Sequence, residues 1–188
     1  TALTLHLDDS TLEGTARVES FESPAITFTA MLDQFNLDRY LPPEAKADAD
    51  ARGADSKVAK TSTDKDEALP LEALRQLNLN GRLDIGRLQA FNLHSRDIEI
   101  QVKSKDGVLT INPLGAKLYE GAVQGDIMLD VRKDTPRFAV NETLTGVQAG
   151  PLLKDLTGKE QLLGTANVKA NLNGAGVSSE QIRQTLDG

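Results

Sequence analysis

The chain has no cysteine and no tryptophan, and its 188 residues include only five phenylalanines and two tyrosines. Without cysteine there is no disulfide, no thiol chemistry and no cysteine-ligated zinc, and the sequence suits both the cytoplasm and the bacterial periplasm. Residues are 39% hydrophobic but only 4% aromatic, so we expect an aliphatic interior. The length is sufficient for one large or two small domains with a real core.

Further absences exclude whole classes of function. No stretch approaches the roughly 18 consecutive apolar residues of a membrane span, and no signal peptide opens the chain. The net charge is −7, and the basic residues alternate with acids instead of forming a patch. We therefore expect no nucleic-acid partner, because phosphate binding needs a basic surface. Thr1 already lies inside a strand pattern, so we expect a fragment whose anchor or targeting signal is missing.

The sequence does contain recurring alternation between apolar and polar residues, most clearly at 77–85, 97–103 and 122–131. Strand side chains alternate between faces, so these segments indicate a sheet with one polar and one apolar face. We expect a mainly β fold: a strongly curved antiparallel sheet, a half-barrel or trough, of about eight to ten strands. Glycines within strands, Gly14, Gly81, Gly125 and Gly164, favour such bending. A few short peripheral helices are expected near 70–76, 148–156 and 178–187, the last two at one end or edge.

The chain divides into three parts. Residues 1–41 form a first β segment, with strands near 2–7, 12–21, 25–32 and 35–40. Residues 42–68 form a polar linker that we expect to be flexible, because it has too few apolar residues to offset its ordering entropy. Its reach of roughly 30 Å would let it join strands that are not neighbours. Residues 69–188 supply the remaining β segment, which packs with 1–41 as one domain; Asp106-Gly107 predicts a tight hairpin turn there.

Catalytic and metal-binding patterns are weak. His6 and Asp8 share a strand face, but two ligands are too few, and an exposed surface histidine is the simpler interpretation. His94 has no partner in the sequence, and no serine lies in a nucleophile elbow. The loop at 174–178 lacks the third glycine and the βαβ unit of a dinucleotide site. We therefore expect no catalytic residues, no metal, no cofactor and no enzyme.

Several segments together resemble one family. Leu-Asp-Arg-Tyr-Leu-Pro at 37–42 resembles the strand-end motif of AsmA proteins, in which a polar, variable segment also follows. The stretches 81–85, 106–114 and 118–121 are similar to the most characteristic part of that family. The helix at 152–156 and the strand that begins at 163–165 continue it in the same order. The resemblance covers most of residues 1–188, apart from the linker.

The resemblance implies a function that alternation alone does not indicate. AsmA-like proteins are anchored in the inner membrane of Gram-negative bacteria by an N-terminal helix and project into the periplasm. They belong to the bridge-like lipid transfer superfamily and support outer-membrane lipid homeostasis and assembly. This implies a phospholipid partner, an inner-membrane anchor that this chain lacks, possible envelope assembly partners, and no catalytic residues to carry over.

Two functions of different classes stay open. One is an apolar β-groove that binds or conducts phospholipid; the other is a non-catalytic assembly module with a closed core, which acts through edge strands or its surface. For the groove we expect aliphatic and aromatic side chains from several strands to line it: Leu83, Ile98, Ile100, Val102, Ile127, Leu129, Val131, Phe138 and Val140.

Overall fold

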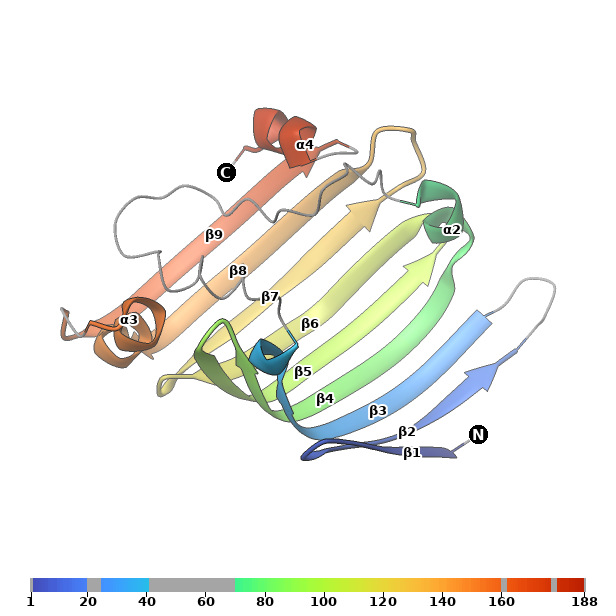
Figure 1. The fold of residues 1–188 in the computed structure, drawn as a ribbon. Coiled ribbons are helices and arrows are strands. Elements are labelled where there is room, and N and C mark those ends of the chain that lie inside the picture. The colour runs from blue at the N-terminus through green and yellow to red at the C-terminus, as the bar shows by residue number, and fades with distance from the viewer. Residues whose placement is uncertain (1, 20–24, 41–69, 160–161, 177–178, 188) are drawn as a thin grey trace.

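Nine strands form one open sheet, and their order in the sheet follows the chain from β1 to β9 (Figure 1). The computed structural model describes residues 2–19, 25–40, 70–159, 162–176 and 179–187. The strands are β1 (Ala2–Leu7), β2 (Ser10–Val18), β3 (Ala25–Asn36), β4 (Asn78–Ala90), β5 (Leu93–Lys105), β6 (Val108–Leu118), β7 (Gly121–Asp130), β8 (Arg137–Gln148) and β9 (Thr165–Ala175). The mainly β expectation is confirmed, and β1 does not pair with β9, so the sheet is not a closed barrel.

Short helices lie at the ends of the strands, close to the segments that the sequence predicts. They are η1 (Leu37–Arg39), α2 (Leu71–Gln76), α3 (Ala149–Thr157) and α4 (Ser179–Thr185). The register places α2 and α4 at one end of the sheet and η1 and α3 at the other, as Figure 1 shows. Asp187, two residues after α4, forms a backbone bridge with Asn173 of β9. This bridge ties α4 to the last strand.

Tight two-residue turns connect the middle strands. Asp106 and Gly107 both have positive φ, 51° and 75°, as a type I′ hairpin turn requires, so this prediction is confirmed. The turns at 91–92 and 119–120 have the same backbone conformation without a glycine. Direct hairpins of this kind explain why successive strands lie next to each other and run antiparallel.

The expectation of a fully antiparallel sheet is wrong at one place, since β3 pairs with β4 in parallel over Ala25–Asn36 and Asn78–Gln89. A parallel neighbour requires the chain to return to the end where β3 began, and a two-residue turn cannot do that. The long connection between Asn36 and Asn78 makes the return possible. It therefore joins neighbouring strands, and the expectation that it joins distant ones is also wrong. The predicted linker, with its expected flexibility, lies outside the described residues over 41–69.

Two smaller expectations also need correction. The short strand predicted at 35–40 does not form, because β3 continues to Asn36 and the chain then turns into η1. Gly164 is not within a strand; it precedes β9 with a φ of 131°. Gly14, Gly81 and Gly125 do lie in strands, where added side chains would meet an adjacent backbone or ring.

The buried core is small for a sheet of this size. Among the described apolar residues, Ile85, Ile98, Val131 and Val147 are buried. Most other apolar side chains of the sheet are only partly buried or are exposed. The sheet therefore keeps much of one apolar surface incompletely covered by the described residues.

Candidate functional site

One face of the sheet carries nearly all of its apolar side chains. Directly paired residues on neighbouring strands share a face, so the register assigns each strand position to one side. One row crosses seven strands at Phe28, Gly81, Val102, Ile111, Ile127, Val140 and Leu172. A second row runs through Ala30, Leu83, Ile100, Leu114, Gly125, Glu142 and Ala170.

We call this surface the apolar face and define it by the positions that the register links together. It comprises Leu3, Leu5, Leu7, Ser10, Leu12, Gly14, Ala16, Val18, Ile26, Phe28, Ala30, Leu32, Leu79, Gly81, Leu83, Ile85, Ile98, Ile100, Val102, Ser104, Leu109, Ile111, Leu114, Val123, Gly125, Ile127, Leu129, Phe138, Val140, Glu142, Leu144, Val168, Ala170, Leu172 and Gly174. Most alternate positions are polar: Arg82, for example, forms 2.8 Å ion pairs with Asp84 and Glu99.

The structure brings together all but one of the nine residues predicted to line a groove. Leu83 pairs with Ile100, Ile127 pairs with Val140, and Leu129 pairs with Phe138. Ile98 and Val102 lie on the same face of β5. Val131 is the exception: it follows the end of β7, is 2% exposed, and donates its backbone N–H to the carbonyl of Gly107.

Exposure is uneven across the apolar face. Leu3, Leu5 and Leu7 on β1 are 56%, 49% and 47% exposed, and Val168 and Leu172 on β9 are exposed as well. The central side chains of β4 to β8 are mostly partly buried. The apolar face thus runs from one edge strand to the other and is most accessible at those edges.

The rings of two phenylalanines lie over glycines of the next strand. A Cβ atom on Gly81 would approach the Phe28 ring to 2.0 Å, and one on Gly174 would approach the Phe138 ring to 2.5 Å. Each phenylalanine is the direct register partner of its glycine. These rings therefore cover the backbone of the sheet and do not project away from it.

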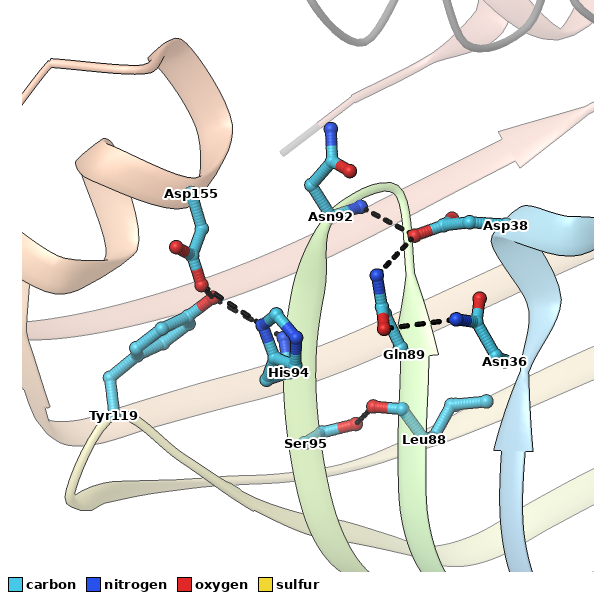
Figure 2. A network of polar contacts seen from close by, with 9 residues as sticks. All are labelled: Asn36, Asp38, Leu88, Gln89, Asn92, His94, Ser95, Tyr119 and Asp155. Carbon is cyan, nitrogen blue, oxygen red and sulfur yellow. Dashed lines mark hydrogen bonds and ion pairs between the residues drawn. The ribbon is translucent and has the colours of Figure 1, made fainter. Parts of the chain in front are cut away.

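A polar network ties η1 to the hairpin between β4 and β5 (Figure 2). The Asp38 carboxylate accepts hydrogen bonds from the backbone N–H groups of Phe91 and Asn92, the latter at 3.0 Å. It also accepts from Nε2 of Gln89 at 3.2 Å, and Oε1 of Gln89 accepts from Asn36 at 3.0 Å. The Asp38 carboxylate thus accepts from both N–H groups of the turn and links η1 to the ends of β4 and β5.

A pocket of about 530 Å³ opens at this end of the sheet. Its lining includes Ser10 of the apolar face and the side-by-side rings of Phe35 and Tyr40, whose centroids are 5.3 Å apart. The Tyr40 hydroxyl donates a short hydrogen bond to Asp8. That bond raises the pKa of Tyr40 above its ordinary value. The pocket therefore has aromatic and aliphatic side chains together with many polar and charged ones in its lining.

A second polar cluster anchors α3 beside the pocket (Figure 2). Oδ2 of Asp155 accepts a 2.7 Å hydrogen bond from the Tyr119 hydroxyl and lies 3.1 Å from Nδ1 of His94. Burial and this bond raise the pKa of Tyr119 to about 12. Burial alone would raise the pKa of Asp155, but the bonds from Tyr119 and His94 hold it below its usual value. The cluster joins α3 to two hairpins, and the sequence did not reveal Asp155 as the partner of His94.

Glu142 differs from every other member of the apolar face, because it is the one ionisable residue in that group. Its carboxyl group lies over Gly125, where an added Cβ would be 2.5 Å from Oε2. Oε2 is buried and has no hydrogen-bond partner among the described residues. Burial, with a smaller effect of Asp126, raises the pKa of Glu142. The alternation of β8 could have located this residue, since position 142 has the same parity as Phe138, Val140 and Leu144.

The remaining sequence candidates do not form a chemical site. His6 is exposed, and its Nδ1 lies 3.2 Å from the Thr11 hydroxyl. Within the described ranges, no group of three or more His, Cys, Asp or Glu side chains is placed to hold a metal ion. Of the helices that the structure describes, none has both the length and the hydropathy needed to cross a membrane.

Comparison with known proteins places these features in a family. The model of the AsmA family matches residues 1–188. The chain is 26% identical over 192 residues to Protein AsmA of Escherichia coli (strain K12). That similarity covers 99% of this chain but 31% of the relative, so the chain corresponds to a part of that length. No solved structure matches the chain.

Proposed function

Because the chain belongs to the AsmA family, we propose that it is part of a bacterial envelope protein that binds phospholipid along the apolar face. The acyl chains would lie across the rows of aliphatic side chains, and the protein would conduct or hold lipid between membranes without catalysing a reaction. We further propose a periplasmic location, with an inner-membrane anchor elsewhere in the full-length protein. These assignments follow from the resemblance of the sequence to the family.

The exposure of the apolar face carries the proposal. Monomeric proteins rarely leave large contiguous apolar patches in water, and such patches mark binding surfaces. Here the patch crosses all nine strands, and it includes the exposed Leu3, Leu5 and Leu7 at one edge and Leu172 at the other. A continuous aliphatic surface of this kind fits a long hydrocarbon ligand better than a compact polar substrate.

Acyl chains could bind this face without any hydrogen bond or other directional contact. Burying hydrocarbon contributes about 0.8 kcal/mol per methylene. An acyl chain that covers even half a dozen methylenes on this face would gain about 5 kcal/mol before the cost of immobilisation. Aliphatic walls let a flexible chain slide, since they offer area without a fixed pocket shape.

The alternative function is a non-catalytic assembly module. It would present the edge strand β1, which has no second neighbour among the described strands, to another protein. Its apolar face would then act as a core closed by other parts of the protein. The two functions differ in what touches Ile100, Ile127 and Leu129: lipid in the first, protein in the second.

Native mass spectrometry of the chain purified in mild detergent tests the proposal. We expect phospholipid adducts on the unmodified chain and their loss in Leu129→Asn, which places a polar group on the apolar face. Met128→Asn is the matched control, because Met128 is the exposed neighbour on the opposite face. Its adducts should remain.

Absence of lipid from the unmodified chain, with folding intact by circular dichroism, would contradict the proposal. Equal loss of lipid from both variants would contradict the assignment of the binding surface. Either result would favour the alternative function, the assembly module. Cross-linking from β1 in intact cells would then test whether another protein binds that edge strand.

A further inference from the structure

Glu142 is placed where an acidic residue is costly. Its register partners are Gly125 on β7 and Ala170 on β9, and its neighbours on the same face of β8 are Val140 and Leu144. Removing a carboxylate from water without a partner is expensive unless the group is paired or neutralised. An aliphatic residue would complete the row without that cost.

Local packing makes room for this carboxyl group. A Cβ atom on Gly125 would lie 2.1 Å from the backbone carbonyl oxygen of Asn141, and 2.5 and 2.6 Å from Oε2 and Cδ of Glu142. A larger residue at 125 would therefore collide with both the Asn141 carbonyl and the Glu142 carboxyl group. Small residues, Gly125 and Ala170, thus flank Glu142 on both neighbouring strands.

The charged group that acts on Glu142 is also negative, although it lies on the other face of β7. Asp126, which accepts a 3.0 Å hydrogen bond from Asn141, adds to the electrostatic effect at Glu142. No cation of the described residues forms an ion pair with Glu142. The missing partner is thus a positively charged hydrogen-bond donor that can approach along an apolar surface.

We infer that the Glu142 carboxylate binds the ammonium group of an amphiphile whose acyl chains lie on the apolar face. This inference rests on the proposed lipid binding and adds a preference for the headgroup. A primary ammonium supplies three N–H donors and one positive charge, and its bond to a carboxylate is charge-assisted. Amphiphiles with an anionic headgroup would instead be repelled by Glu142 and Asp126.

The experiment compares two phospholipids with identical acyl chains, phosphatidylethanolamine and phosphatidylglycerol, in competition for the 188-residue chain. We expect the ethanolamine lipid to be preferred about tenfold, the effect of one charge-assisted hydrogen bond. Glu142→Gln should remove the preference while retaining total lipid binding. Glu13→Gln, an identical change at an exposed position of the polar face, should keep the preference.

A second arm separates this inference from the proposed function. Dodecylammonium and dodecanol share one alkyl chain, and Glu142→Gln should weaken binding of the amine about tenfold without affecting the alcohol. Equal phospholipid preference in the unmodified chain and Glu142→Gln overturns the inference while lipid binding stands. If no phospholipid binds, the proposed function is wrong. The inference about Glu142 is then tested by the amine alone: equal binding of dodecylammonium to the unmodified chain and to Glu142→Gln would overturn it. Ethanolamine without a tail should compete weakly, and strong competition would overturn the assignment to an amphiphile.

Glu142→Met gives an independent readout that does not depend on binding. It replaces an unpaired carboxylate by an apolar side chain of similar length, so we expect a higher melting temperature together with lost headgroup preference. A rise in melting temperature with unchanged preference would overturn the inference and mark Glu142 as a residue without a binding role.

Discussion

Substitutions at two isoleucines of β5 can distinguish an open apolar face from a sealed core. Ile98 and Ile100 are two residues apart on the same face of one strand. Ile98 is 6% exposed and pairs with the buried Ile85, whereas Ile100 is only partly buried beside Leu83 and Leu114. Replacing each by aspartate therefore applies one chemical change to two different environments.

The expected losses of stability differ by several kcal/mol. Ile98→Asp forfeits about 1.5–3 kcal/mol of apolar burial and also places an unpaired carboxylate away from water, so the total is about 4 kcal/mol or more. In Ile100→Asp the new carboxylate can be hydrated, and we expect a loss of about 1–2 kcal/mol. The difference of about 3 kcal/mol corresponds to about 6–12 °C in melting temperature for a chain of this size.

Urea unfolding followed by far-ultraviolet circular dichroism measures both losses, because the chain has no tryptophan for fluorescence. If the slope of the unfolding free energy against urea concentration is the same for both variants, they expose the same surface area on unfolding. The difference should narrow as the pH falls towards 4, since protonation removes the buried charge of Ile98→Asp. Equal, large losses in both variants would refute the reasoning, because the apolar face would then be a sealed core.

Three further predictions concern single contacts. Gly81→Ala should destabilise the protein by about 1–3 kcal/mol, because its Cβ would collide with the Phe28 ring; Phe28→Leu in the same chain should recover part of the loss, and additive losses in urea unfolding would contradict the contact. Asp38→Ala should cost about 1–2 kcal/mol and speed amide exchange at Phe91 and Asn92, because their N–H groups lose the carboxylate that accepts from both; unchanged exchange would argue against the network. Tyr119 has a pKa of about 12 in the folded protein and about 10 when unfolded, so its contribution to stability is complete below pH 10 and declines as the pH rises from 10 to 12. Tyr119→Phe should show a smaller decline, because only Tyr40, whose pKa is also raised, then remains. Ultraviolet titration of the unmodified chain and of Tyr119→Phe should assign the tyrosinate that forms near pH 12 to Tyr119.

Alternation in the sequence identified most of the sheet but could not specify which strands are neighbours. It located the strands because one side of each is apolar, and Asp106-Gly107 identified one hairpin because glycine readily takes a positive φ. The turns at 91–92 and 119–120 were missed, since no glycine marks them. The parallel pairing of β3 with β4 was missed because alternation is the same in parallel and antiparallel neighbours.

The candidate site was predictable to a similar degree. Eight of the nine groove residues share the apolar face because strand parity places them there. Val131 has the same parity as Ile127 and Leu129, so the sequence could not show that β7 ends before it, at Asp130. Asp38 and Asp155 act through partners 36 to 61 residues away in the sequence, and no local pattern specifies such contacts.

The shape of the apolar face distinguishes between its two proposed occupants. A protein partner gains most of its affinity from aromatic or arginine side chains that fill pockets at the centre of an interface. The two phenylalanines of this face instead lie against Gly81 and Gly174, so they offer no projecting anchor. What the face does offer is aliphatic area that extends from β1 to β9, with its most exposed leucines at one edge. Acyl chains gain free energy from area alone. The arrangement therefore favours lipid over a protein partner as the occupant of this face.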